Sequence, residues 1–123
     1  MPRILILDND VSVLRAAAIF FEAHGYEVVT SGSAADFEKL LEREMPDLAL
    51  IDVSMPDTTG DTLVGKIRRR LGYRCCPLLF WSSKPPEQLE ELVRSSGASG
   101  FISKSWTSTA ILEQIQAFSA RNE

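Results

Sequence analysis

Five short runs of aliphatic residues recur along the chain and constrain its fold more than any other feature. They cover Arg3 to Leu7, Tyr26 to Thr30, Leu48 to Ile51, Pro77 to Trp81 and Ser99 to Ser103. Their apolar character is nearly continuous instead of alternating, which is typical of strands covered on both faces of a sheet. The runs therefore predict five strands of a parallel sheet.

Segments with helical spacing of apolar residues lie between and after these runs. They cover Val11 to His24, Ser33 to Glu44, Asp61 to Leu71, Pro86 to Ser96 and Thr107 to Ala120. In the first of them, Val11, Leu14, Ala18 and Phe21 recur at helical spacing, and Gly25 is placed to end the helix. Parallel strands need crossover connections, which are right-handed and put helices on both faces of the sheet. We therefore predict a doubly wound α/β domain of five βα units, with the flavodoxin-like strand order 2-1-3-4-5.

The bulk properties of the chain exclude several classes of protein. A length of 123 residues suits one compact domain, so we expect a single domain over residues 1–123 with no output domain. The net charge of −4 gives no electrostatic basis for binding nucleic acid. No apolar run is long enough to span a membrane and no signal peptide is evident, so we expect a cytoplasmic protein. The adjacent Cys75 and Cys76 suit neither a structural disulfide nor a zinc site and are expected to be reduced.

Polar residues gather directly after the predicted strands, where open α/β sheets bind their ligands. They are Asp8, Asn9 and Asp10 after the first strand, Asp52 after the third, Ser82 and Ser83 after the fourth, and Lys104 at the end of the fifth. In the strand order 2-1-3-4-5, Asp8 and Asp52 follow neighbouring strands and are placed to share one cation, for which Mg²⁺ is well suited. Asp10 is expected to cap the first helix.

These residues also suit a reaction. Phosphoryl transfer needs charge neutralisation and positioning, and a carboxylate can itself act as the nucleophile. Lys104 adds a positive charge to the two carboxylates, and Ser82 adds a hydroxyl group. The residues at this edge of the sheet therefore predict a site for phosphoryl transfer.

The ordered set of motifs resembles the response-regulator receiver domain family of two-component signalling over the whole length of the chain. The stretch from Ile4 to Asp10 resembles the acidic opening of that family, and Asp52 to Pro56 with Gly60 resembles its phosphoacceptor loop. Ser82 falls at the family's switch Ser or Thr, and Gly100 to Lys104 falls where the family has an aromatic residue and a lysine.

This resemblance implies a phosphorylation switch and not an enzyme with a substrate of its own; at most, the domain catalyses its own phosphorylation and dephosphorylation. Asp52 would accept a phosphoryl group from a histidine kinase or a histidine phosphotransfer protein. Asp8, Asp52 and the backbone carbonyl of Ser54 would hold Mg²⁺, with Asn9 at the remaining ligand position.

The same resemblance assigns the switch. Ser82 and Lys104, with Ser83 next to them, would contact the phosphoryl group, and movement of Ser82 would let Phe101 pack inward. The face built from the fourth helix, the fifth strand and the fifth helix would then bind a downstream protein effector or form a homodimer. A core aromatic without a switching role is an equal reading of Phe101.

Three residues depart from the family pattern. Asn9 replaces an acidic metal ligand, so the site loses a negative charge and we expect weaker Mg²⁺ binding. Ser105 replaces the proline that usually follows the lysine, and because a cis bond before a non-proline residue costs about 3–4 kcal/mol, we expect Lys104–Ser105 to be trans. Ser82 is a serine and not a threonine. Because serine lacks the methyl group that restricts χ1 in threonine, we expect its two switch positions to be less sharply defined.

Two alternatives remain at this stage. The first is a pseudo-receiver, an interaction module that signals without phosphate, which Asn9 and Ser105 motivate. The second is a small flavin-binding electron carrier with the same strand order. The loop from Asp8 to Asp10 argues against it, because an acidic loop repels a phosphate unless a cation intervenes.

Overall fold

The computed structural model describes residues 1–73 and 75–121. Its centre is one parallel sheet whose strand order, β2-β1-β3-β4-β5, confirms the prediction. The strands are β1 (Arg3–Leu7), β2 (Glu27–Ser31), β3 (Leu48–Asp52), β4 (Leu78–Ser82) and β5 (Gly100–Ser103). Four of the five strands differ from the predicted ranges, by a residue at one end or at both.

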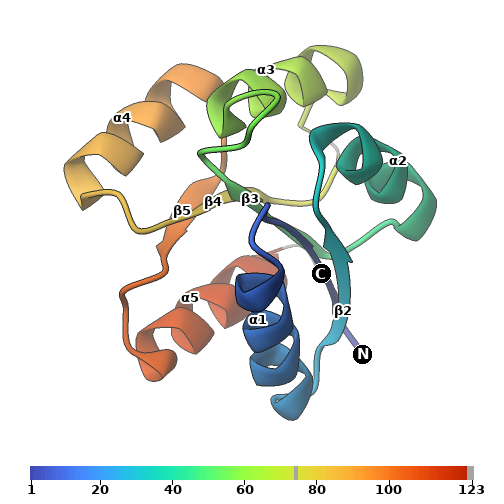
Figure 1. The fold of residues 1–123 in the computed structure, drawn as a ribbon, viewed down its shortest axis with the longest axis vertical. Helices are drawn as coiled ribbons and strands as arrows, with labels where there is room; N and C mark the ends of the chain where they lie inside the picture. Colours follow the sequence, from blue (N-terminus) through green and yellow to red (C-terminus); the bar gives the residue numbers. More distant parts are fainter. Residues whose placement is uncertain (74, 122–123) are drawn as a thin grey trace.

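Helices cover the two faces of this sheet. They are α1 (Val11–Ala23), α2 (Ala34–Glu44), α3 (Gly60–Leu71), α4 (Pro86–Ser96) and α5 (Ser108–Arg121). Figure 1 shows α1 and α5 together on one side of the sheet, with α2, α3 and α4 on the other. This is the three-layer arrangement expected for right-handed crossovers between parallel strands.

Alternate residues of the central strands enter two separate cores, because successive side chains of a strand point to opposite faces. In β1, Leu5 and Leu7 pack in the cluster on the side of α2 and α3, whereas Ile4 and Ile6 pack with α1 and α5. Both sets are almost inaccessible to solvent. The nearly continuous apolar runs in the sequence therefore reflect strands that are buried on both faces.

The core-facing stripe of α1 differs from the prediction in two residues. Val11 is 61% exposed, and Ala17 is buried in place of Ala18, beside Leu14 and Phe21. Val11 lies in the first turn of the helix and follows the capping residue Asp10, whose carboxylate accepts a hydrogen bond from the Ser12 amide at 2.9 Å. The prediction for Val11 was wrong because an apolar residue at a helix start need not reach the sheet.

The predictions for Asp10 as a helix cap and for Gly25 at the end of the first helix are confirmed. Ser33 caps α2 by accepting a hydrogen bond from the Asp36 amide, and Gly25 follows α1 with a positive φ of 89°. Cys75 and Cys76 are free, the former half-buried and the latter buried. Across the described ranges, every helix is too short or too polar to cross a bilayer.

Candidate functional site

Two carboxylates and one ammonium group meet at the carboxyl edge of the sheet. Asp8 follows β1, Asp52 is the last residue of β3, and Lys104 follows β5. The Nζ atom of Lys104 lies 2.6 Å from Oδ2 of Asp8 and 3.8 Å from Oδ1 of Asp52. Asp8 is 1% exposed and Asp52 is 7% exposed. The three charges therefore form one buried cluster.

Lys104 reaches this cluster from the far side of the sheet. Two strands, β3 and β4, separate β5 from β1, so the contact between Lys104 and Asp8 joins residues that follow strands not adjacent in the sheet. Its ammonium group lies 5.8 Å from the centre of the Trp81 ring, which is within the range of a cation–π contact. Trp81 was not among the residues singled out in the sequence, because it belongs to the apolar run of β4.

Burial and charge together raise the pKa of Asp52. The main cause is burial, and the negative charge of Asp8 adds to it, while Lys104 and the backbone N–H of Ser54 act in the opposite direction. That N–H donates to Oδ1 of Asp52 at 3.2 Å. One ammonium group does not balance two buried carboxylates, so the site favours a further positive charge.

Gly60 holds the loop between β3 and α3 against Asp52. Its backbone N–H donates to the carbonyl of Val53 at 2.7 Å. A Cβ atom at this position would lie 2.7 Å from the carbonyl oxygen of Asp52 and 2.9 Å from Cα of Val53. Only glycine permits so close an approach, so Gly60 fixes where Ser54 and Asp52 lie relative to α3.

The other predicted site residues lie around this cluster without entering it. Ser82 is buried and its hydroxyl accepts a hydrogen bond from the Lys84 amide at 3.0 Å, while Ser83, Asn9 and Ser54 are exposed. Asp10 caps α1 and also donates its backbone N–H to Oδ1 of Asp8 at 2.9 Å.

Phe101 is half-buried and packs on the core beneath α3 and α4. Its ring centre lies 5.6 Å from that of Trp106 in the connection that leads to α5. The residue is therefore neither fully inward nor free in solvent.

The peptide bond between Lys104 and Ser105 is trans, as expected. The lysine backbone stays in register with β4, since its N–H donates to the carbonyl of Ser82 at 2.9 Å. At the end of β5, the hydroxyl of Ser103 accepts a hydrogen bond from the Ser105 amide and also lies within hydrogen-bonding distance of the Ser105 hydroxyl.

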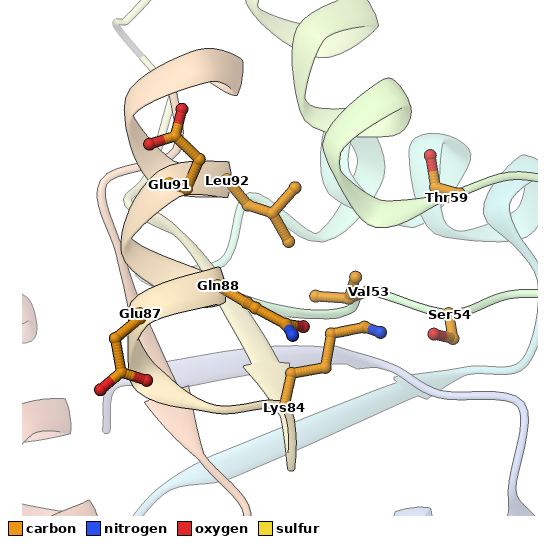
Figure 2. Close-up of a pocket in the computed structure, with 8 residues that line it drawn as sticks. All are labelled: Val53, Ser54, Thr59, Lys84, Glu87, Gln88, Glu91 and Leu92. Atoms are coloured by element: carbon orange, nitrogen blue, oxygen red, sulfur yellow. The ribbon is translucent and has the colours of Figure 1, made fainter.

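A groove opens beside Asp52, between the loop that follows β3 and the first turns of α4. It has a volume of about 550 Å³, and its lining residues are Val53, Ser54, Thr59, Lys84, Glu87, Gln88, Glu91 and Leu92. Figure 2 shows the Lys84 side chain extending across this groove toward Ser54, with Glu87 and Glu91 on the α4 side. Lys84 was missed in the sequence although it lies only two residues after β4.

The donors at the cluster fit a hard divalent cation. Within residues 1–73 and 75–121, no three His, Cys, Asp or Glu side chains form a metal-binding group. Mg²⁺, however, commonly uses only one or two carboxylates and completes its shell with water and phosphate oxygens. The buried pair of Asp8 and Asp52, with excess negative charge, meets that requirement.

The fold and the cluster define a doubly wound α/β domain with an acidic site at the switch point of its strand order. The sequence profile of the response regulator receiver domain matches residues 4–116. The chain belongs to this family, which confirms the resemblance seen in its motifs.

Individual relatives agree with this assignment. The chain is 25% identical over 122 residues to the transcriptional regulatory protein KdpE of Mycobacterium tuberculosis, covering 99% of this chain and 53% of that protein. It is 30% identical over 117 residues to the CAI-1 autoinducer sensor kinase/phosphatase CqsS of Vibrio cholerae, covering 94% of this chain and 17% of that protein. The chain thus spans about half of the first relative's length and a smaller part of the second's.

Solved structures share the fold. A CheY-like response regulator receiver domain protein from Methanospirillum hungatei superposes with a TM-score of 0.86 at 25% identity, covering 99% of this chain and 96% of the other. The doubly wound fold predicted from the sequence is therefore confirmed.

Proposed function

We propose that this domain is a phosphorylation switch in which Asp52 accepts a phosphoryl group, with a histidine kinase or a histidine phosphotransfer protein as the donor and the cytoplasm as the compartment. The observation that carries the proposal is the buried cluster in which Lys104 bridges Asp8 and Asp52. Membership of the receiver family supports a role in two-component signalling.

In the proposed reaction, a carboxylate oxygen of Asp52 forms a bond to phosphorus while the bond between phosphorus and the donor's imidazole nitrogen breaks. Asp8, Asp52, Asn9 and the backbone carbonyl of Ser54 would hold Mg²⁺, which supplies positive charge to the phosphoryl oxygens when bound. Lys104 already lies between the carboxylates and would pair with the charge that the phosphoryl group brings.

The proposed output starts at the end of β4. Ser82 would turn its hydroxyl from the Lys84 amide toward the phosphoryl group, with Ser83 next to it. Phe101 would then move further into the space beneath α4, which requires its contact with Trp106 to rearrange. The face of α4, β5 and α5 would change shape and bind a downstream protein effector or a second copy of the chain.

Mass spectrometry of the intact protein tests the acceptor. Incubation with acetyl phosphate and Mg²⁺ should add the mass of one phosphate to the wild type and none to Asp52→Asn. Asp57→Asn is the matched control, because it changes an exposed aspartate of the same loop. This variant should still gain the mass of one phosphate. Phosphate added to Asp52→Asn at the wild-type level would refute the assignment.

The pseudo-receiver alternative keeps one specific argument, which is the neutral and exposed Asn9 at a ligand position. If the wild type gains no phosphate at any Mg²⁺ concentration, this alternative is favoured. If Asn9→Asp then gains phosphate, the missing charge at position 9 is the reason.

A further inference from the structure

The position of the Lys104 ammonium group depends on the direction of its side chain more than is the case for the other groups of the site. Its long, flexible side chain places Nζ 2.6 Å from Oδ2 of Asp8, although two strands separate β5 from β1 in the sheet, so a small change in backbone direction at the end of β5 moves the ammonium group considerably. Misplacement of a catalytic group by about 1 Å can cost up to about a hundredfold in rate. Some feature of the connection between β5 and α5 must therefore fix this direction.

The backbone ladder fixes only one side of Lys104. On the side toward β4, the backbone N–H of Lys104 donates to the carbonyl of Ser82. The next residue is Ser105, which has neither the ring that locks φ in proline nor a cis peptide bond. After Lys104, the Trp106 N–H donates to the carbonyl of Ser103 at 3.2 Å and closes a turn, so the direction of Lys104 within that turn depends on side-chain contacts as well.

The hydroxyl of Ser103 reinforces this turn. Ser103 is 3% exposed, and its Oγ atom accepts a hydrogen bond from the Ser105 N–H at 3.2 Å and lies 2.8 Å from the Ser105 hydroxyl. Both bonds connect the residue before Lys104 to the residue after it. Hydrogen bonds of this kind, donated by a backbone N–H to the side-chain oxygen of a serine two residues earlier, stabilise a turn.

We propose that Ser103 is a positioning residue, whose hydroxyl turn with Ser105 aims Lys104 at Asp8 in place of the rigid proline. A buried hydroxyl needs a hydrogen-bond partner, and Ser105 provides two for Ser103. The kinetic part of this inference rests on the proposed phosphorylation of Asp52, and the structural part does not.

The test compares two serines with the same local geometry. Ser96 also accepts a hydrogen bond from the amide two residues later, Ala98, at 3.2 Å, but it lies at the end of α4. Ser103→Ala should slow phosphorylation by acetyl phosphate about tenfold, and Ser96→Ala should not slow it. Thermal unfolding of both variants shows whether the fold is retained, and Ser103→Thr, which keeps the hydroxyl, should restore the rate.

A second experiment distinguishes an effect on the direction of the Lys104 side chain from a general effect on the fold. If Ser103 acts through the lysine, Ser103→Ala should have no further effect on the rate in a Lys104→Ala background. An equal loss in both backgrounds, or a wild-type rate in Ser103→Ala, would overturn the proposal.

The ¹⁵N resonance of the Lys104 ammonium group gives a readout that needs no phosphorylation. It should shift or broaden in Ser103→Ala and stay unchanged in Ser96→Ala. If the wild type is not phosphorylated at all, the proposed function fails but this measurement still decides the inference. An unchanged resonance in Ser103→Ala would refute it.

Discussion

The ammonium group of Lys104 lies 2.6 Å from the Asp8 carboxylate, although 96 residues separate the two in the sequence. The contact exists because both residues follow parallel strands that end at one edge of the sheet. It joins the two ends of the chain's βα series and neutralises one of the two buried carboxylates. Several consequences of this arrangement are measurable.

Removing the lysine should make the domain more dependent on a divalent cation. In Lys104→Ala, Asp8 and Asp52 keep their burial and lose their counter-charge, so the free energy of unfolding without metal should fall by roughly 1–3 kcal/mol, less than for a fully buried pair because Lys104 is partly exposed. Mg²⁺ should raise the melting temperature of this variant more than that of the wild type. Equal shifts in the two proteins would show that lysine and metal do not occupy the same electrostatic role.

The raised pKa of Asp52 predicts a dependence of stability on pH. A carboxyl group whose pKa is higher in the folded than in the unfolded state binds more protons when folded, so stability should increase as the pH falls through that folded pKa. The window lies above the ordinary aspartate value of 3.8.

Asp52→Asn isolates this effect from the other titrating groups. It removes the buried charge, so it should raise the melting temperature at neutral pH without metal and flatten the pH profile in that window. Denaturant titrations at several pH values, with Asp57→Asn as the control, measure the difference. A less stable Asp52→Asn at neutral pH would contradict the electrostatic account.

Two glycines of α3 should respond to alanine in opposite directions. Gly60→Ala places a Cβ within 2.7 Å of the Asp52 backbone, so it should destabilise the domain by about 1–3 kcal/mol and displace Asp52. At Gly65 the nearest atom to a Cβ is the end of the flexible Arg69 side chain, 3.4 Å away. Gly65→Ala should therefore stabilise the helix by about 0.5–1 kcal/mol. Chemical denaturation measures both, and a destabilised Gly65→Ala would show that the helix is tightly packed there.

The groove beside Asp52 predicts a role for Lys84 in the reaction with anionic donors. Lys84→Glu reverses the charge that Figure 2 shows extending toward Ser54, so it should slow phosphorylation by acetyl phosphate severalfold, more strongly at low salt. Lys39→Glu makes the same change of charge at an exposed position of α2 and should have little effect. If both variants slow the reaction equally, net charge and not the groove is responsible.

The two adjacent cysteines should differ in reactivity. Burial raises the pKa of Cys76 to about 12, whereas the Cys75 thiol is half-buried. Alkylation at pH 8 should therefore modify Cys75 first and Cys76 only when the domain unfolds, because the thiolate is the reactive form. Peptide mass mapping before and after addition of urea distinguishes the two positions, and rapid native labelling of Cys76 would contradict its burial.

The sequence alone was sufficient for the order of the elements and placed their limits to within one residue. Runs such as Leu48 to Ile51 are apolar throughout because both faces of the strand are buried, and that pattern is local. Asp10 and Gly25 likewise act within a few residues of themselves, so their capping and terminating roles were predictable.

Contacts between distant residues required the tertiary structure. The sequence predicted that Asp8, Asp52 and Lys104 share an edge, but the sheet register and the path of the Lys104 side chain over Trp81 set which atoms meet. The position of Lys84 in the groove and the burial of Ser103 depend in the same way on elements packed from elsewhere in the chain. Periodicity and helix capping depend on residues close together in the sequence, whereas the direction of a side chain, its burial and its pKa depend on the whole packed domain.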